Sequence, residues 1–307
     1  MIVLACFCAL GQVLAQDDEK VVRVDTKLAG FEVLVEDQNG KPVHGLKQQD
    51  FRIFEDGKPR SIDFFQPVLS PGGERPLVIV FAVDVSGSMT LPEIEKLRSA
   101  ISGFIDRFGN HESYFSVVSF AMEVKRLQSF TNRPEQLRRA LANLDREQSG
   151  RSTHAFDAVD DAIRLIERSA PKNVRGRSPK NAVIVITDGF PVGDTVAPRT
   201  VIERANRTGT SVYSIILPSY SPTGRDTRPL MTIFEASGIV DRTGGSSLYA
   251  IDNNFEPLFN SLASEITSSY AIAFYPDELA AGKRNVRIES VKGYRIKQNR
   301  STYELNK

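Results

Sequence analysis

Oxygen-bearing side chains follow an apolar run near residue 80. The segment Leu77-Val-Ile-Val-Phe-Ala-Val-Asp84-Val-Ser86-Gly-Ser88 places one carboxylate and two hydroxyls at alternate positions. This spacing lets Asp84, Ser86 and Ser88 point toward one centre as the backbone curls. All three offer oxygen and only one carries charge, which suits a hard divalent cation, Mg²⁺ first, and does not suit Zn²⁺ or a soft metal. The low formal charge would leave the ion electrophilic and ready for an anionic ligand from outside the chain.

Two further segments offer oxygen ligands at the ends of predicted elements. Gly150-Arg-Ser-Thr153 places a hydroxyl at the start of an amphipathic helix pattern, and Ala182-Val-Ile-Val-Ile-Thr187-Asp188-Gly189 is a second apolar strand that ends in an acidic turn. The segment near residue 80, taken alone, has an alternative interpretation without a metal. Asp84 and Ser86 could simply cap a helix after a tight turn, since Asp and Ser favour such positions.

These three segments, in this order, resemble the von Willebrand factor type A domain and its metal-ion-dependent adhesion site (MIDAS). The resemblance implies hydroxyl ligands at Ser86, Ser88 and Thr153, and carboxylates at Asp84 and Asp188 that commonly act through water. It also implies that the last metal position is filled by water or by an Asp or Glu of a partner protein. Mg²⁺ is the expected cofactor, with Mn²⁺ or Ca²⁺ as alternatives.

Residues 76–269, which carry all of these groups, alternate strand and helix patterns. Such alternation predicts an open, doubly wound, mostly parallel α/β sheet with helices on both faces. Ligands of such sheets bind beyond the carboxyl ends of the strands, where Asp84 and Asp188 are expected. Strands are predicted near 77–84, 114–121, 124–130, 182–187, 211–217 and 247–251. Helices are predicted near 92–108, 134–144, 154–168, 198–208, 230–242 and 255–268.

Strand patterns flank this α/β segment on both sides. Residues 21–70 alternate in short runs with a hairpin turn signal at Asp37-Gln-Asn-Gly40, a turn at Asp56-Gly57, and a further strand at Arg60-Ser-Ile-Asp-Phe-Phe. Residues 270–307 return to the same pattern. Since neither half suffices for a closed core, we predict one β-sandwich built from both, with the α/β domain (76–269) inserted between them.

This arrangement resembles the bacterial VWFA-related proteins known mainly from Acidobacteria. In that family a segment such as Gly45-Leu-x-x-x-Asp-Phe-x-x-x-Glu-Asp-Gly57 precedes the type A domain. The resemblance covers nearly the whole chain after residue 15, and it implies an architecture more than an activity.

The first 15 residues are predicted to be a cleaved signal peptide. The apolar run is too short to span a bilayer comfortably, and Val13-Leu-Ala before Gln16 has the small-residue pattern of a signal-peptidase site. A secreted or periplasmic location follows, with lipoprotein anchoring at Cys6 as the alternative. Cys6 and Cys8 are the only cysteines, so the processed chain would have neither disulfides nor thiol chemistry.

Composition gives no case for a nucleic-acid or anionic-membrane partner. With 39 basic and 38 acidic residues the net charge is +1, and no basic stripe interleaved with aromatic residues occurs. We therefore expect no nucleic-acid partner. No stretch after the N-terminus approaches the length of a transmembrane helix. The oligomeric state and the partner's identity are left open.

Two side chains near Thr153 are candidates for modulating the site. Asp157 lies one helical turn from Thr153 and could support it by hydrogen bonding. His154 could lie near the metal and make binding pH-dependent, although a solvent-facing first-turn residue is the simpler interpretation.

The sequence thus predicts a non-enzymatic adhesion or scaffolding module that coordinates a partner's carboxylate through Mg²⁺. Two alternatives remain: a metal-assisted hydrolase, and a structural envelope protein with an inactive site. No G-x-S-x-G motif supports a serine hydrolase, because Val85-Ser-Gly-Ser88 lacks the first glycine.

Overall fold

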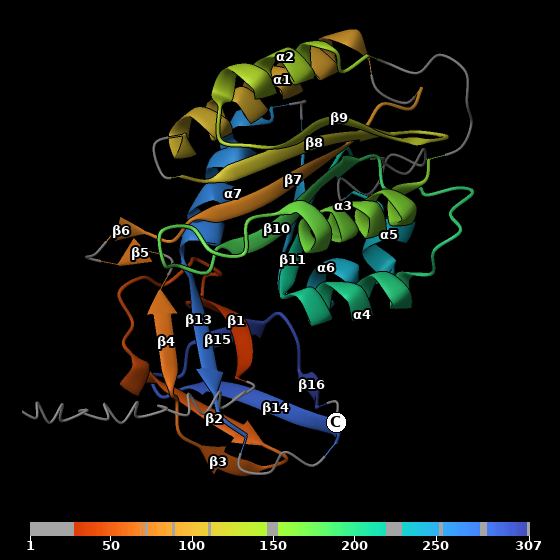
Figure 1. Cartoon of the computed structure of the whole chain (residues 1–307). Helices are drawn as coiled ribbons and strands as arrows, with labels where there is room; N and C mark the ends of the chain where they lie inside the picture. Colours follow the sequence, from red (N-terminus) through yellow and green to blue (C-terminus); the bar gives the residue numbers. More distant parts are fainter. Residues whose placement is uncertain are drawn as a thin grey trace, which may run out of the picture.

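A six-stranded sheet forms the centre of the α/β part of the chain (Figure 1). The computed structural model describes residues 28–67, 69–70, 73–87, 90–109, 112–145, 153–218, 229–251, 254–276 and 281–305. The strand order is β12-β11-β10-β7-β8-β9, and every neighbouring pair is parallel except β8 and β9. The strands are β7 (Leu77–Asp84), β8 (Tyr114–Phe120), β9 (Val124–Thr131), β10 (Lys180–Thr187), β11 (Thr210–Ile216) and β12 (Ser247–Tyr249).

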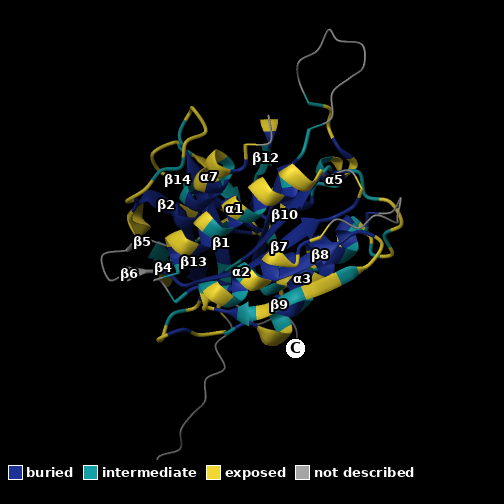
Figure 2. Cartoon of the chain, turned by 90° about the horizontal axis from the view of Figure 1, so that it is seen from above, coloured by how far each residue is buried: buried dark blue, intermediate teal, exposed yellow. Residues whose placement is uncertain are grey.

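The continuous apolar run of β7 is explained by helices on both faces of the sheet. All eight residues of the strand are buried. From Leu77 to Val83 its odd-numbered residues join one apolar cluster, and its even-numbered residues, up to Ala82, join another. A strand covered on both sides needs no polar alternation. Figure 2 shows β7 and β10 in the colour of buried residues beneath helices with exposed outer sides.

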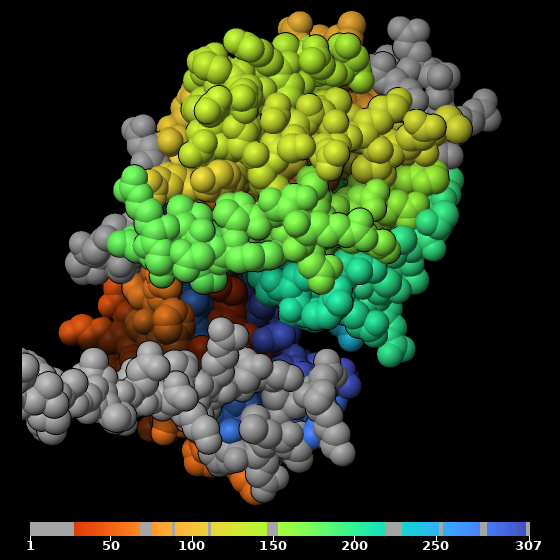
Figure 3. All heavy atoms as spheres, in the orientation of Figure 1, coloured from red at the N-terminus to blue at the C-terminus, as the bar shows by residue number. Residues whose placement is uncertain are grey.

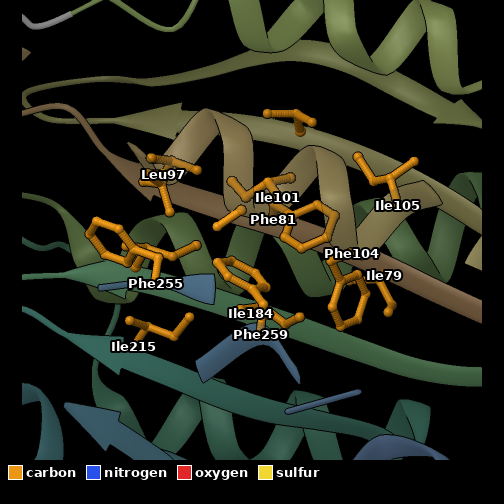
Figure 4. Close-up of a cluster of buried hydrophobic side chains, with 14 of the residues drawn as sticks. Ile79, Phe81, Leu97, Ile101, Phe104, Ile105, Ile184, Ile215, Phe255 and Phe259 are labelled. Carbon is orange, nitrogen blue, oxygen red and sulfur yellow. The ribbon is translucent and has the colours of Figure 1, made fainter. Parts of the chain in front are cut away.

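Two layers of helices cover this sheet, as predicted for a doubly wound fold. On one face Phe81 of the sheet meets Phe104 and Phe259, with ring centroids 5.7 and 6.2 Å from its own (Figure 4). This face is covered by α1 (Leu91–Phe108), α2 (Pro134–Ala142) and α7 (Glu256–Thr267). The other face is covered by α3 (Ala155–Ser169), α4 (Pro198–Thr208), α5 (Ile233–Ala236) and α6 (Ile239–Arg242).

Two four-stranded sheets form the predicted β-sandwich, in the orders β15-β1-β13-β4 and β16-β14-β2-β3. Their core includes Phe31 and Phe274 from the first sheet and Ile53 and Ile288 from the second. The first sheet contains β1 (Ala29–Glu36), β4 (Phe64–Pro67), β13 (Ser269–Phe274) and β15 (Arg295–Gln298). The second contains β2 (Phe51–Glu55), β3 (Lys58–Arg60), β14 (Gly282–Ser290) and β16 (Thr302–Leu305). Shorter elements are η1 (Gln48–Asp50), β5 (Leu69–Ser70) and β6 (Gly73–Glu74).

Strands from both ends of the chain pair with each other in both sheets of the sandwich, so the α/β part is inserted between its halves. β1 pairs antiparallel with β13, from Ala29 opposite Phe274 to Leu34 opposite Ser269. β2 likewise pairs with β14. Figure 3 shows the α/β part, yellow to teal, stacked on the orange and blue sandwich.

A buried ionic cluster joins the sandwich to the amino ends of the parallel strands. Glu32 of β1 accepts from Arg75 Nη1 at 2.5 Å. Lys180, the first residue of β10, donates from Nζ to Ser269 Oγ at 2.8 Å. Burial lowers the pKa of Lys180. The carboxyl ends of the parallel strands therefore lie at the edge opposite this contact.

Three local predictions differ from the structure. The helix predicted near 230–242 is divided into α5 and α6, because Gly238 adopts a left-handed conformation at φ 70°. The strand predicted from Arg60 to Phe65 is two strands in different sheets, since the chain leaves β3 and joins β13, where Asp63 N donates to the Ala273 carbonyl. The chain reverses after Glu36 as predicted, with the Val43 amide donating to the Val35 carbonyl at 2.8 Å, but it forms one isolated antiparallel bridge, Glu36 to Pro42, instead of a second strand.

The predicted signal peptide (1–15) and Cys6 lie outside the described residues. Among the described helices, none is long and apolar enough to cross a membrane.

Candidate metal site

The carboxyl ends of β7 and β10 lie side by side, because the two strands are parallel neighbours with Val83 opposite Ile186. The next residues along the two strands, Asp84 and Thr187, are joined by a hydrogen bond. Thr187 Oγ1 donates to Asp84 Oδ2 at 2.8 Å. Asp188 follows Thr187, so both predicted carboxylates belong to one edge of the sheet.

Asp84 is a buried carboxylate, and hydrogen bonds from the described residues Ser86 and Thr187 offset its charge. Its side chain is fully inaccessible, and Oδ1 accepts from the Ser86 amide at 2.9 Å. Burial raises the pKa of Asp84 to about 6; hydrogen bonds from Ser86 and Thr187 oppose the shift, and the nearby charge of Asp188 adds to it. Desolvation is thus the dominant cause.

Asp188 opens a tight turn that packs against the start of α5. Its Oδ1 accepts from the Phe190 amide at 3.1 Å. Gly189 has φ 81°, and a Cβ there would lie 2.5 Å from Thr232 Oγ1. Glycine is required by both conformation and space, and this close approach fixes the turn that carries Asp188.

Thr153 reaches the same edge through backbone pairing. Its amide donates to the Val192 carbonyl at 3.1 Å, and the Val192 amide donates back at 3.0 Å. The next residue, His154, donates from its amide to the carbonyl of Ala121, which follows β8. Thr153 therefore lies between the end of β8 and the loop that follows the second carboxylate, and its side chain is buried.

Of the three predicted hydroxyl ligands, Ser86 and Thr153 are placed by the structure and Ser88 lies outside the described residues. Ser86 is buried, and both its amide and its hydroxyl hydrogen-bond Asp84. Within the described ranges no group of three or more His, Cys, Asp or Glu side chains gathers as a metal cluster. The predicted set contains only two carboxylates and depends on hydroxyls for the rest.

Asp157 is engaged by a neighbouring loop. Its carboxylate accepts from the Val196 amide at 2.7 Å and from the Thr195 amide at 3.0 Å. The His154 ring nitrogen Nδ1 lies 3.1 Å from Asp157 Oδ2. Hydrogen bonds from these groups outweigh desolvation and lower the pKa of Asp157. Asp157 thus holds residues 195–196 in place. These contacts differ from the hydrogen bond to Thr153 that the sequence suggested.

Two supporting residues were not recognised from the sequence. Thr187 joins β10 to β7 through the bond that it donates to Asp84, and its Oγ1 also accepts from the Gly189 amide at 3.0 Å. Asp194 accepts from the Asp157 amide at 2.9 Å and so holds the first turn of α3. The position of Thr187 at a strand end was a usable signal for its role, whereas Asp194 lies in a loop whose path depends on tertiary packing.

The donor chemistry at this edge fits a hard divalent cation. The neighbours that shift the pKa of Asp84 most are Ser86, Thr187 and Asp188, and none of them is a cation. A divalent ion would supply positive charge where two carboxylates approach each other, and oxygen donors match Mg²⁺, Mn²⁺ or Ca²⁺. Thr153 and Ser86 would hold such an ion directly, with the carboxylates beside it.

Comparison with known proteins identifies the family to which this fold belongs. Residues 79–255, more than half of the chain, match the model of the von Willebrand factor type A domain. Inter-alpha-trypsin inhibitor heavy chain H4 of Sus scrofa is 28% identical over 121 residues, covering 39% of this chain and 13% of that protein. Integrin alpha-M of Mus musculus is 25% identical over 193 residues, covering 61% and 15%. The chain thus spans only a small part of the length of these relatives.

A solved structure with a similar fold is proximal thread matrix protein 1 from the mussel byssus, described with a zinc-occupied MIDAS motif. It is 14% identical, and the match covers 66% of this chain and 48% of that one with a TM-score of 0.49.

Proposed function

Since this chain belongs to the von Willebrand factor type A family, we propose that it is a non-enzymatic adhesion or scaffolding module that binds a partner protein through Mg²⁺. Ser86, Ser88 and Thr153 hold the ion, and Asp84 and Asp188 hold its water ligands. An Asp or Glu of the partner completes the coordination. Because the ion contributes binding energy directly, chelation weakens the complex.

The observation that carries this proposal is the approach of two carboxylates at one sheet edge, where none of the described neighbours that most affect the pKa of Asp84 is a cation. Asp84 is buried, its pKa is raised to about 6, and the charge of Asp188 acts on it. A cation bound beside these two carboxylates would offset their mutual repulsion and favour the ionised form of both. This edge also faces away from the buried cluster that joins the sandwich, so a large partner has access to it.

The position of His154 favours binding over hydrolysis. Its Nδ1 faces Asp157 at 3.1 Å, and its Nε2 lies 2.8 Å from the position of a Cβ on Gly193. The ring is thereby packed between the first turn of α3 and the 192–196 loop. A base that activates metal-bound water must be within hydrogen-bonding reach of that water. Since the contacts of the His154 ring are with Asp157 and the 192–196 loop, we assign this residue a structural role and not that of a base.

We place the protein outside the cytoplasm on the pattern of residues 1–15. An apolar segment followed by Val13-Leu-Ala before Gln16 is typical of a cleaved signal. Anchoring at Cys6 is the alternative form of the same placement.

Calorimetric titration of Mg²⁺ and Mn²⁺ into the protein and two variants tests the metal site. Asp84→Ala removes the central carboxylate, and Asp145→Ala is the matched control, since the Asp145 side chain is 86% exposed. Saturable binding is expected in the wild type and in Asp145→Ala and is lost in Asp84→Ala, with circular dichroism unchanged. Equal affinity in Asp84→Ala would show that the assignment is wrong.

A further inference from the structure

Exposed apolar side chains gather at the edge of the sheet that carries the candidate metal site. Among the described residues eleven large apolar side chains are exposed, and four of them belong to the sandwich. The other seven all lie in segments that follow the carboxyl ends of β7, β8, β10, β11 and β12. They are Leu91, Met122, Val192, Leu230, Met231, Ile233 and Ile251. In the described residues of the α/β part, all exposed large apolar side chains thus lie at this edge.

On one side of the site, two of these side chains flank a residue that touches the acidic turn. Met231 is 76% exposed and Ile233 is 55% exposed, while Thr232 between them is 1% exposed. Thr232 is the residue that the Cβ position of Gly189 approaches at 2.5 Å. Met231 and Ile233 therefore project to solvent beside the turn that begins at Asp188.

On the other side, Met122 and Val192 are tied to the segment of Thr153. Val192 is 53% exposed and exchanges two backbone hydrogen bonds with Thr153. Met122 is 48% exposed and follows Ala121, whose carbonyl accepts from the amide of His154. The exposed apolar groups therefore stand on both sides of the carboxylates and hydroxyls.

Apolar surface concentrated in one region of a protein marks a site of interaction, because its exposure to water is unfavourable until a partner covers it. We propose that the partner presents its Asp or Glu within an apolar segment, so that side chains next to the carboxylate pack on this rim. The inference rests on the proposed function, since the carboxylate is the group that reaches the ion. A hydrophilic segment would leave the rim in water and gain only the coordination itself.

Short synthetic peptides with one central Asp test this proposal by fluorescence polarisation. One set flanks the Asp with Leu and Phe, a second flanks it with Ser and Gly, and a third replaces the Asp with Asn. Each is titrated with the protein in MgCl₂ and in EDTA. The double variant Met231→Gln/Ile233→Gln removes part of the rim and leaves Thr232 in place. Val291→Gln is the control, because Val291 is 50% exposed but lies beside β14 of the sandwich.

Apolar flanks are expected to tighten Mg²⁺-dependent binding by about tenfold, which corresponds to about 1.4 kcal/mol. This preference should fall to about twofold in the double variant and persist in Val291→Gln. Equal EDTA-sensitive binding of both Asp sets would overturn the rim and leave the metal function intact. If peptides with apolar flanks bound more tightly but their affinity changed neither in EDTA nor on replacement of Asp by Asn, the rim would be supported as a binding surface and the metal function would be rejected. If no Asp peptide bound in saturating Mg²⁺, the proposal that apolar side chains beside the Asp pack on the rim would also be wrong.

Discussion

Replacing Asp84 with Asn is expected to stabilise the metal-free protein at neutral pH while abolishing its metal binding. The side chain is fully buried, and its pKa is raised from 3.8 to about 6 in the folded state. Ionised Asp84 is therefore less favourable in the folded chain than in the unfolded chain. Asn has the same shape and no charge, so it removes this penalty together with the affinity for a cation.

The magnitude follows from the shift in pKa. A pKa that differs by one between the folded and unfolded states corresponds to about 1.36 kcal/mol. The rise in the pKa of Asp84 from 3.8 to about 6 therefore destabilises the ionised form by roughly 3 kcal/mol. Asn accepts from the Ser86 amide but cannot accept from Thr187 through its NH₂ group, which costs about 1 kcal/mol. The net gain in free energy of unfolding is about 2 kcal/mol near pH 7.

The pH dependence has a definite sign. Because the folded pKa is raised, the stability that wild-type Asp84 contributes is complete below about pH 4 and is lost as the pH rises through about 6. The advantage of Asp84→Asn should therefore be full above about pH 6 and disappear below about pH 4. Metal affinity of the wild type should fall over the same interval, because the ion requires the ionised carboxylate.

Urea denaturation of both proteins in EDTA and in MgCl₂, near pH 7 and near pH 4, measures these effects. In EDTA at neutral pH the variant should have the higher midpoint. In MgCl₂ the order should reverse, since an ion present at about 100 times its Kd adds about 2.7 kcal/mol to the wild type alone. A wild type more stable than Asp84→Asn in EDTA near pH 7 would refute the reasoning about buried charge.

Further substitutions test the supports around the site and the junction with the sandwich. Gly189→Ala should lower the free energy of unfolding by more than about 2 kcal/mol, because φ is 81° and the new Cβ would lie 2.5 Å from a threonine hydroxyl oxygen; Gly176→Ala, at φ 80° in open space, is the control with about 1 kcal/mol. Thr187→Val should cost about 2 kcal/mol in urea denaturation by leaving the Gly189 amide without its acceptor, and failure of Thr187→Ser to recover most of it would contradict this. Arg75→Met should destabilise by about 3 kcal/mol, because buried Glu32 loses its closest cation and keeps only Lys180, whose Nζ lies 3.9 Å from Oε2. Adding Glu32→Gln should restore part of the loss, and strictly additive effects would argue against a coupled pair.

The sheet and its helices were predictable because their patterns are local. The apolar run of β7 and the amphipathic pattern of α3 each identify the element and its buried side without knowledge of the neighbours. Gly238 is a local signal too, but a glycine within a helical pattern is often tolerated. That Gly238 ends α5 depends on its left-handed φ of 70°, which sequence patterns do not specify.

Residues 60–65 were mistaken for one strand because alternation does not reveal which sheet a strand joins. Arg60 pairs with Ile53 in one sheet, whereas Phe65 pairs with Ile272 in the other. Both partners are known only once the two halves of the sandwich meet.

Within the candidate site, the strand ends were predictable and the loop contacts were not. Asp84 and Asp188 were placed at the carboxyl edge by the rule for parallel sheets, and the register of β7 and β10 brings them there. The engagement of Asp157 by Thr195 and Val196 joins residues nearly forty positions apart. Helical spacing suggested Thr153 as its partner because only local neighbours can be read from a sequence.

The pairing of β1 with β13 sets the order in which the chain can fold during synthesis. Ala29 lies opposite Phe274, so the first strand emerges from the ribosome long before its partner exists. The α/β segment, whose sheet neighbours are contained within it, can fold in that interval. Until then β1 is an unpaired and largely apolar edge, the kind of segment that recruits other chains. Closing the sandwich is a long-range step and therefore a slow one, which makes this strand the point at which the nascent protein most needs protection.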